Sequence, residues 1–303
     1  MHAFAGICLY MPDVLTLREA AAFLRLSERS LYELARGRRV PAAQLGGKWL
    51  FPRAQLERWL AAQADGPDSV GRLDPPPILA GSHDPLLDWA VRQSGCGLAL
   101  RTGGSLEGLA AVAEGTALAA ATHLLDPDTG AFNEPAAREV LAGRGVVGIT
   151  WAWREQGLIV PPGNPGGLAA VADLARPGVR VAGRQKRAGS HVLLMHLLAE
   201  AGVWLGQVAF LAEPALSEDE VAAAVADGRA EAGFGIRAEA SARGLGFVPL
   251  VRERFDLVME RRHYFGPPLQ ALLGFARSGA FAARAARMGG YDTTALGAVA
   301  FNL

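Results

Sequence analysis

The sequence has few of the features that mark a specialised class of protein. Its two cysteines, Cys8 and Cys96, have a spacing that suits neither a metal site nor a redox pair, so we expect a reducing cytoplasm. No run approaches the roughly 18–20 consecutive apolar residues of a membrane span. The first residues lack the basic leader and cleavage site of a signal peptide; residues 1–10 fit no expected element, and Met11 is an alternative start. The composition fits a soluble protein of two or three compact units.

The net charge is zero, but it is distributed unevenly along the chain. Residues 1–63 hold nine arginines and lysines against five acidic residues, which gives a net charge of +4. The remaining 240 residues therefore carry −4. A basic head on a neutral-to-acidic body indicates that the head binds a polyanion.

Residues 14–63 show the pattern of a small DNA-binding domain. A capping box of the T-x-x-E type begins at Thr16 and opens an apolar helical stripe. After a short turn, Ser27 can cap a second helix. Two short apolar stretches on either side of Gly46-Gly47 predict a hairpin, and a third helical pattern follows. Helix, turn, helix, hairpin and helix make a winged helix-turn-helix domain.

This order of elements, with the residues "LTLREAAAFLRLSERSLYELARGRRVPAAQLGGKWLF", resembles the excisionase/MerR-like winged helix-turn-helix family. The resemblance implies that the second helix enters the major groove of double-stranded DNA and that the hairpin reaches phosphates or the minor groove. The candidate base-reading residues are Arg29, Ser30, Tyr32 and Arg36, and the candidate phosphate contacts are Arg38, Arg39 and Lys48. The alternative is a protein-interaction head whose arginines are only a solvated face, and Tyr32 could equally pack against the fold.

Residues 64–77, "ADGPDSVGRLDPPP", are rich in proline, glycine and aspartate and predict a stiff linker. From Ile78 onward, short apolar strands alternate with helical patterns, which predicts an α/β fold. Three strand ends carry glycine and serine directly before a helix, in "AGSHDP", "TGGSLEGL" and "RAGSHVLL". Small residues let a ligand approach the backbone, and a serine adds a hydroxyl to the free N–H groups of a helix start. Together the three predict an anion site with mostly neutral donors.

The second domain resembles the periplasmic-binding-protein-like domain that follows a helix-turn-helix in bacterial regulators. That domain is distantly related to periplasmic molybdate- and tungstate-binding proteins. The resemblance covers most of residues 78–292 and rests most specifically on "GSHDPLLD", "REQGLIVPPGNP" and "GRQKRAGSH". It implies a two-lobed type II domain over residues 78–303, with lobe one at about 78–154 and 265–303 and lobe two at about 155–264. It also implies a small oxyanion effector, molybdate or tungstate, and no other cofactor.

The cleft candidates are the serine-bearing helix starts and the histidines and arginine near them. The predicted ligand-binding residues are Ser82, His83, Asp84, Gly104, Ser105, His123, Arg184, Gln185, Gly189, Ser190 and His191. The serines are assigned to the anion oxygens and Arg184 to the anion charge. The histidines at 83 and 123 are assigned to the pocket wall, and Asp84 is expected to cap its own helix.

The sequence departs from the resembled family at one point. Members of that family usually read asparagine-arginine-glutamine and then glycine-threonine-arginine. This chain has Gly183-Arg184-Gln185 and Gly189-Ser190-His191. A titratable histidine thus replaces a fixed cation, which leaves the identity of the ligand open.

Three other kinds of site fit the sequence less well. Ser82, His83 and Asp84 are immediate neighbours at a helix start, so their side chains fan apart and cannot form a hydrolase triad. The six histidines and two cysteines show no metal-ligand spacing, so we expect no protein-bound metal. The pair Gly233-x-Gly235 lacks the later glycine of a dinucleotide site. We therefore expect no enzymatic activity and no catalytic residues.

The sequence as a whole predicts a cytoplasmic one-component transcription regulator that binds DNA and senses molybdate or tungstate. We expect a homodimer on a palindromic site, because one small winged helix offers little surface for base contacts. Two alternatives stay open. One keeps the regulator and changes the ligand to an organic acid or another small polar metabolite; the other is an oxyanion storage or delivery protein whose head serves assembly.

Overall fold

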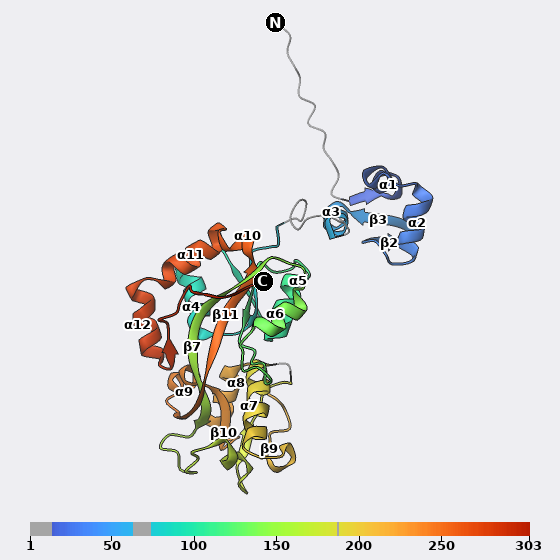
Figure 1. Ribbon diagram of the computed structural model, residues 1–303. Coiled ribbons are helices and arrows are strands. Elements are labelled where there is room, and N and C mark those ends of the chain that lie inside the picture. The colour runs from blue at the N-terminus through green and yellow to red at the C-terminus, as the bar shows by residue number, and fades with distance from the viewer. Residues whose placement is uncertain (1–13, 63–73, 187) are drawn as a thin grey trace. The chain divides into compact units, whose positions relative to one another are not determined.

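The computed structural model of the protein describes residues 14–62, 74–186 and 188–303 (Figure 1). The chain divides into two compact units, and the boundary along the sequence lies between Asp74 and Pro75. Most of the predicted linker lies outside the described residues, but Pro77 already belongs to the second unit, because its carbonyl oxygen accepts a hydrogen bond from Ala99 N–H at 2.9 Å. In the described ranges, every helix is too short or too polar to cross a membrane.

The first unit is a three-stranded antiparallel sheet with three helices. Its elements are β1 (Val14–Thr16), α1 (Leu17–Leu24), α2 (Glu28–Arg36), β2 (Ala43–Leu45), β3 (Lys48–Pro52) and α3 (Arg53–Ala62), and its strand order is β1-β3-β2. The predicted helix-turn-helix, hairpin and third helix are confirmed, and β1 is an additional strand. The turn between β2 and β3 has Gly46 at φ +54° and Gly47 at φ +75°, the left-handed conformations that a tight hairpin turn requires.

Local capping explains why the two helices of the turn motif begin where they do. Glu19 accepts a hydrogen bond from Thr16 N–H at 2.8 Å, and Thr16 Oγ1 accepts one from Glu19 N–H, so the predicted capping box is present. Ser27 Oγ accepts a hydrogen bond from Ser30 N–H at 3.0 Å and caps α2. Leu31 and Phe51 are fully buried in the small core that joins α2 to β3. The first unit therefore has its own caps and its own core.

The second unit contains two lobes built on one ten-stranded sheet, in the order β5-β4-β6-β11-β7-β10-β8-β9 with β12 and β13 paired to β7. Lobe one contains β4 (Ile78–Ser82), α4 (Pro85–Ser94), β5 (Ala99–Gly103), α5 (Ser105–Ala113), β6 (Ala119–Thr122), α6 (Glu134–Val140), α10 (Arg261–Tyr264), α11 (Pro267–Ala276), α12 (Gly279–Met288), β12 (Tyr291–Asp292) and β13 (Val299–Asn302). Lobe two contains η1 (Val171–Ala175), β8 (Arg180–Ala182), α7 (Gly189–Glu200), η2 (Leu205–Gln207), β9 (Ala209–Phe210), α8 (Glu218–Ala226), β10 (Ala232–Ile236) and α9 (Arg237–Ala242).

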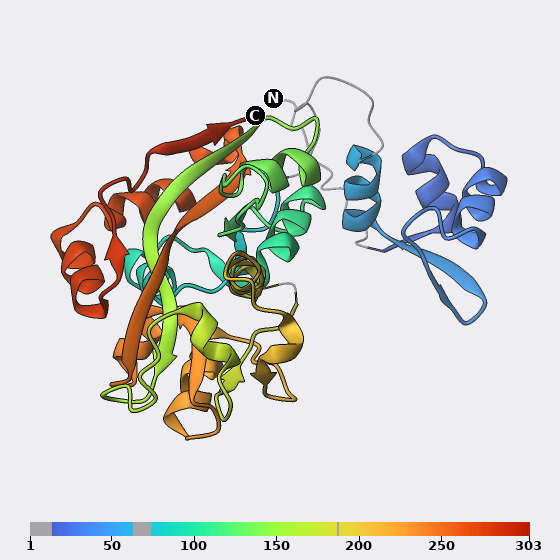
Figure 2. The same ribbon diagram turned by 60° about the horizontal axis from the view of Figure 1, so that its bottom comes forward.

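Two long antiparallel strands, β7 (Val146–Val160) and β11 (Gly246–Glu260), run through both lobes (Figures 1 and 2). In lobe one, β11 pairs with β6 over residues 256–259. The predicted boundary of lobe two at residue 264 is therefore wrong. The chain returns to lobe one within β11, because one strand of this length serves the sheets of both lobes.

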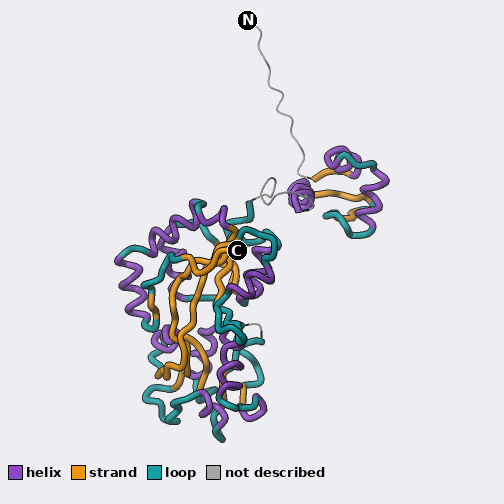
Figure 3. The backbone as a smooth tube through the Cα atoms, in the orientation of Figure 1, coloured by secondary structure: helices purple, strands orange, loops and turns teal. Residues whose placement is uncertain are grey.

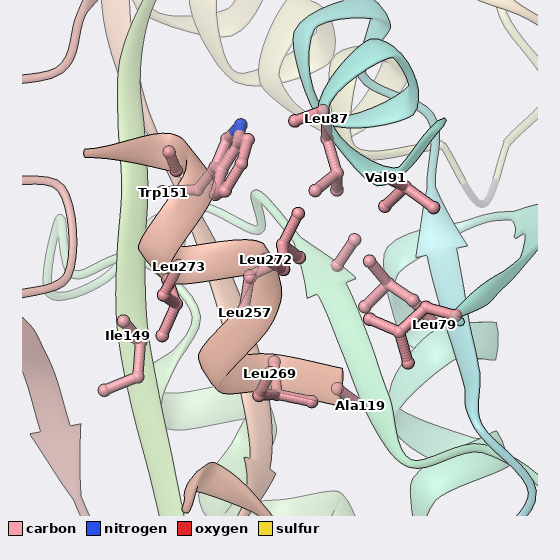
Figure 4. Packing of buried hydrophobic residues seen from close by; sticks show 14 of the residues in the cluster. Leu79, Leu87, Val91, Ala119, Ile149, Trp151, Leu257, Leu269, Leu272 and Leu273 are labelled. Atoms are coloured by element: carbon pink, nitrogen blue, oxygen red, sulfur yellow. The ribbon is translucent and has the colours of Figure 1, made fainter. Parts of the chain in front are cut away.

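The core of lobe one lies between the sheet and two helices. Leu87 and Val91 of α4 point into the same apolar space as Leu272 of α11, above Leu79 of β4 (Figure 4). Trp151 of β7 is fully buried on this core. Burial of these side chains fixes α4 on the sheet, and with it the end of β4 where the first predicted serine lies.

The core of lobe two fixes the position of α7. Leu193 and Leu194 of α7 pack with Leu158 and Val160 of β7 on one face of the sheet. Ile159 points to the opposite face, where it packs in a separate cluster with residues of α8. The sheet of lobe two is therefore covered by α7 on one face and by α8 on the other. Figure 3 shows the strands of the second unit with helices around them.

Candidate functional site

The first two serine-bearing helix starts meet in lobe one. The hydroxyls of Ser82, at the end of β4, and Ser105, at the start of α5, lie 2.7 Å apart, and both side chains are buried. Ser105 Oγ also accepts a hydrogen bond from the backbone N–H of His123 at 3.2 Å. Gly104 caps α5 and donates its N–H to Glu107 Oε2 at 3.1 Å. Lobe one thus brings four of the predicted residues together.

Asp84 is held by the fold. Its Oδ1 accepts a hydrogen bond from Leu87 N–H at 2.7 Å and caps α4, as expected. Its Oδ2 accepts hydrogen bonds from Arg154 Nη1 at 3.0 Å and from the Tyr291 hydroxyl at 2.7 Å. Both carboxylate oxygens are engaged, so Asp84 orients α4 and Arg154.

A buried ion pair lies between the two lobes. Arg154 of β7 and Glu253 of β11 have side chains 1% and 0% exposed, and Arg154 Nε donates to Glu253 Oε1 at 2.8 Å while Nη2 donates to the same oxygen. The guanidinium also lies over the ring of Phe255, 4.3 Å from its centroid. Burial would raise the pKa of Glu253, but the charges of Arg154 and His123 lower it to about 2. Glu253 is therefore a carboxylate throughout the physiological range.

His123 joins lobe one to lobe two. Its Nδ1 lies 2.8 Å from Glu253 Oε2, and its ring stacks on Phe255 at a centroid distance of 5.8 Å. The ring also lies against Gly189, the first residue of α7, where a Cβ would come within 2.7 Å of His123 Cε1. Only glycine permits this approach, so the predicted "GSH" segment of lobe two meets the predicted histidine of lobe one.

The start of α7 has polar side-chain atoms without a partner among the described residues. It has no acidic residue in its first turn and no side-chain cap. Among the residues that the structure describes, Ser190 Oγ and His191 Nδ1 are buried without a hydrogen-bond partner, and Ser190 is 1% exposed. Burial lowers the pKa of His191 below its usual value of 6.5, so its imidazole is neutral near pH 7. This helix start can therefore bind an anion through N–H and O–H donors.

Arg184 and Gln185 lie within lobe two, just after β8. Arg184 Nε donates to Gln185 Oε1 at 3.0 Å, and Nη2 donates to the carbonyl oxygen of Leu216 at 3.2 Å. Burial lowers the pKa of Arg184 from its usual high value. These contacts hold the guanidinium beside the start of α8 and engage two of its N–H donors, while its charge is paired with no carboxylate in the described residues.

His83 lies beside Ser82 and Asp84 in lobe one. These three residues line a cavity of about 20 Å³ together with Leu100 and Arg101, and all the lining residues belong to lobe one. A cavity of that size holds about one water molecule. This cavity therefore joins His83 to Ser82 of lobe one and not to the residues of lobe two.

The predicted DNA-contacting residues are all exposed in the first unit. Arg29, Tyr32 and Arg36 follow one another along the face of α2 opposite the buried Leu31 and Ala35. Tyr32 is 42% exposed, so the alternative in which its ring packs inside the fold does not hold. Ser30 Oγ lies 2.7 Å from Ser27 Oγ at the cap of α2. The other predicted contacts, Arg38, Arg39 and Lys48, lie after α2 and at the start of β3.

Two family models match the chain, one for each unit. The model of the PBP superfamily domain matches residues 88–277. The chain belongs to the PBP superfamily. The model of the helix-turn-helix domain matches residues 14–64. The predicted combination of a helix-turn-helix domain with a periplasmic-binding-protein-like (PBP) domain is confirmed, and this is the organisation of a DNA-binding regulator with a domain for a small ligand.

The whole chain is similar to another bacterial protein, and its PBP domain is similar to solved structures. An uncharacterised Bacillus subtilis protein, YvgK, is 26% identical and aligns with 94% of this chain and 96% of its own length. A putative phosphate transporter substrate-binding protein from Clostridium perfringens, solved with bound phosphate, has a TM-score of 0.51 at 12% identity, over 70% of this chain and 96% of its own. The periplasmic binding protein BugD has a TM-score of 0.51 at 10% identity, over 71% of this chain and 86% of its own. These two structures share the fold of the PBP domain.

The PBP domain offers neutral hydrogen-bonding groups at the junction of its lobes. Within the described ranges, no group of three or more histidine, cysteine, aspartate or glutamate residues could hold a metal ion. The hydroxyls of Ser82, Ser105 and Ser190 and the first N–H groups of α7 can bind oxygen atoms of a small ligand. Such a set supports binding, and both matched families describe binding modules and not enzymes.

Two buried charged residues at this junction, Arg154 and Glu253, were not predicted from the sequence. Arg154 and Glu253 stand in the apolar strand patterns "ITWAWREQGLIV" and "VPLVRERFDLVM". Charged residues are almost never buried unless they are paired, so charges of both signs within two long apolar strands were a usable signal for a buried ion pair. Their pairing depends on the register of β7 and β11, which places Arg154 opposite Glu253.

Proposed function

We propose that this protein is a cytoplasmic transcription regulator that binds DNA as a homodimer and changes its DNA binding when a small anion binds between the lobes of its PBP domain. The observation that carries the proposal is the start of α7, where the buried Ser190 hydroxyl has no hydrogen-bond partner among the described residues and Gly189 lies on His123. A ligand at this point contacts both lobes. Its affinity therefore depends on how the lobes are arranged, which is what a sensor requires.

Molybdate or tungstate is the first candidate for the anion. The resemblance of the sequence to molybdate- and tungstate-binding proteins favours it, and neutral donors at helix starts suit a tetrahedral oxyanion. Both anions have longer bonds to oxygen than sulfate has. A site of their size would leave the donors poorly matched to sulfate, so we expect molybdate or tungstate to bind more tightly than sulfate.

An organic acid is the second candidate, and the charges at the junction favour it. The carboxylates of Asp84 and Glu253 both contact the single guanidinium of Arg154. The charge of Arg154 is therefore already balanced by carboxylates of the fold, and two donors of Arg184 are engaged by neutral oxygen atoms. A ligand with one negative charge needs less positive charge around it than a dianion.

Titration calorimetry with the full chain tests the ligand class. The panel contains molybdate, tungstate, sulfate, phosphate and small carboxylates. Ser190→Ala should weaken binding of the active anion by about 1–3 kcal/mol, because a charge-assisted hydrogen bond is lost. Ser241→Ala, on the exposed surface of α9, is the control and should bind like the wild type. If no anion in the panel produces heat, the proposal is wrong.

A DNA-binding assay separates a regulator from a storage or delivery protein. In a gel mobility-shift assay, the full chain should slow the migration of the DNA upstream of its own gene. The active anion should change the fraction of that DNA that is bound. A protein that binds the anion but shows no sequence-selective, salt-sensitive DNA binding would be a storage or delivery protein.

A further inference from the structure

Gln156 is a buried polar side chain whose orientation is fixed by a charge. It lies on β7 and is 0% exposed, and its Nε2 donates to Glu253 Oε1 at 2.9 Å. The reverse orientation of the amide would place two acceptors, the Gln156 carbonyl oxygen and the Glu253 carboxylate, against each other. The carboxylate therefore sets the amide so that Oε1 faces away from Glu253.

Alternation along β7 shows which face of the sheet Gln156 occupies. The strand pairs with β10 in regular register from Gln156 to Ile159, so residues two apart lie on the same face. Leu158 and Val160 pack with α7, whereas Ile159 packs on the face of α8. Gln156 therefore lies on the α7 face.

Gln156 also lies close to the start of α7 along that face. The two oxygens of one carboxylate, Glu253, bind Gln156 Nε2 and His123 Nδ1 at 2.9 and 2.8 Å. The ring of His123 in turn lies against Gly189. On α7, Ser190 precedes the sheet-facing Leu193 and Leu194 by one helical turn, so it points to the same side of the helix.

The acceptor of Gln156 has no donor in the described part of the chain. Oε1 is buried without a hydrogen-bond partner, and so is Ser190 Oγ. The two atoms therefore do not bond to each other. A buried amide oxygen is stable only when a donor reaches it, and Oε1 can accept but cannot donate.

We propose that Gln156 Oε1 is a specificity-determining acceptor for the ligand between the lobes. The site then selects a small anion that carries its own O–H or N–H donor, such as a hydroxy acid, over an anion without one. The negative group binds at the start of α7, and the donor of the same molecule binds Gln156. This inference rests on the proposed function and narrows its ligand class, because molybdate and tungstate carry no hydrogen at neutral pH.

Matched pairs of carboxylates test the acceptor by calorimetry on the full chain. Glycolate is compared with acetate, lactate with propionate, and all four with molybdate. The wild type should bind each hydroxy acid about 10-fold or more tightly than its partner, because an analogue without the hydroxyl leaves the acceptor unpaired. In Gln156→Met, which keeps the length of the side chain, the preference should fall below about 3-fold. The control Gln270→Met removes a glutamine that donates to the Tyr264 carbonyl in lobe one, and it should keep the wild-type preference.

The failure of this inference differs from the failure of the proposed function. Equal binding within each pair, or molybdate binding more tightly than both hydroxy acids, overturns the role of Gln156 and leaves an anion sensor. No heat from any of the five anions, or from tungstate, sulfate and phosphate, overturns the anion sensor itself. If circular dichroism shows that Gln156→Met does not fold, the wild-type preference within the two pairs decides the question alone.

Discussion

At the scale of single residues, Ser105 makes more hydrogen bonds at the junction of the lobes than Ser82 does. Its hydroxyl bonds both to Ser82 Oγ and to the backbone N–H of His123, whereas Ser82 Oγ makes only the first of these contacts. We expect Ser105→Ala to lower the free energy of unfolding by about 1–3 kcal/mol, because the buried N–H of His123 loses its acceptor, and Ser82→Ala to lower it by less. Urea unfolding of the two variants measures the difference, and equal losses would contradict the network described here.

Glu239 of α9 should make stability depend on pH. It is 5% exposed, and burial, together with the nearby charges of Glu218 and Asp219, raises its pKa to about 7. In the unfolded chain the group ionises near pH 4.5. Below pH 4.5 Glu239 is protonated in both states and has no effect on the free energy of unfolding. As the pH rises from 4.5 towards 7, the free energy of unfolding falls, because the unfolded chain gives up this proton more readily than the folded protein.

The variant Glu239→Gln removes this loss. It should be about 1–3 kcal/mol more stable than the wild type at pH 8.5 and equally stable at pH 4. Urea midpoints at the two pH values measure the effect. Glu114→Gln, at an exposed glutamate after α5, is the control and should follow the wild type at both values. A gain that is the same at pH 4 and pH 8.5 would show that the charge is not its cause.

The residues that the sequence could indicate are those defined by a local pattern. The glycine-serine pairs before helices mark Ser82, Ser105 and Ser190, because a helix start is a local feature of the chain. Gln156 and its partner Glu253 are 97 residues apart in the chain. Their meeting depends on strand register, for which no local pattern exists.

At the scale of elements, the contact between α7 and lobe one can be tested with two helical glycines. Gly189→Ala places a Cβ 2.7 Å from His123 Cε1, so the helix or the ring must move. Gly274→Ala, in α11, places a Cβ where no atom lies within 4 Å. We expect Gly189→Ala to destabilise by about 1–3 kcal/mol through overpacking. We expect Gly274→Ala to stabilise by up to about 1 kcal/mol through helix propensity.

Hydrogen exchange adds a local readout to the unfolding measurement. In Gly189→Ala the amides at the start of α7 and around His123 should exchange faster, while those of α11 stay protected. If both glycine variants change stability in the same direction, α7 does not depend on close contact with His123.

Elements with strong local signals could be predicted from the sequence, whereas a short strand and the pairing of strands could not. The capping box at Thr16 and the cap at Ser27 identified α1 and α2, since both signals lie within four residues. The strand β1 was missed because three residues show no clear alternation. The boundary of lobe two was misplaced because β11 is one continuous strand pattern, and only its pairing with β6 shows which part belongs to lobe one.

At the scale of the whole molecule, the full chain should bind DNA through the exposed basic residues of its first unit. Affinity should fall steeply with salt, because counterions leave the phosphates on binding. Lys48→Ala should weaken binding to all sequences. It should also reduce the slope of the logarithm of affinity against the logarithm of salt concentration by about 1. Arg36→Ala should instead reduce the preference for the specific site, by about 1–3 kcal/mol if it reads a guanine.

Fluorescence anisotropy with specific and random duplexes at several salt concentrations measures both effects. Arg92→Ala, an exposed arginine of α4 in the PBP domain, should change neither. If Arg36→Ala and Lys48→Ala weaken binding to the two duplexes equally, α2 does not read bases.

The two long strands that pass between the lobes also define where lobe two is inserted. The chain enters lobe two along β7 and leaves along β11, and Gln156 stands opposite Val251 in the register of these strands. The entry and the exit of the lobe are thus cross-strand neighbours, although 94 residues lie between them. A shortened chain in which a tight turn replaces those residues would close β7 and β11 into an ordinary hairpin on lobe one. Lobe two is therefore an insertion between two neighbouring positions of one strand pair, and the rest of the sheet keeps its strand order with or without it.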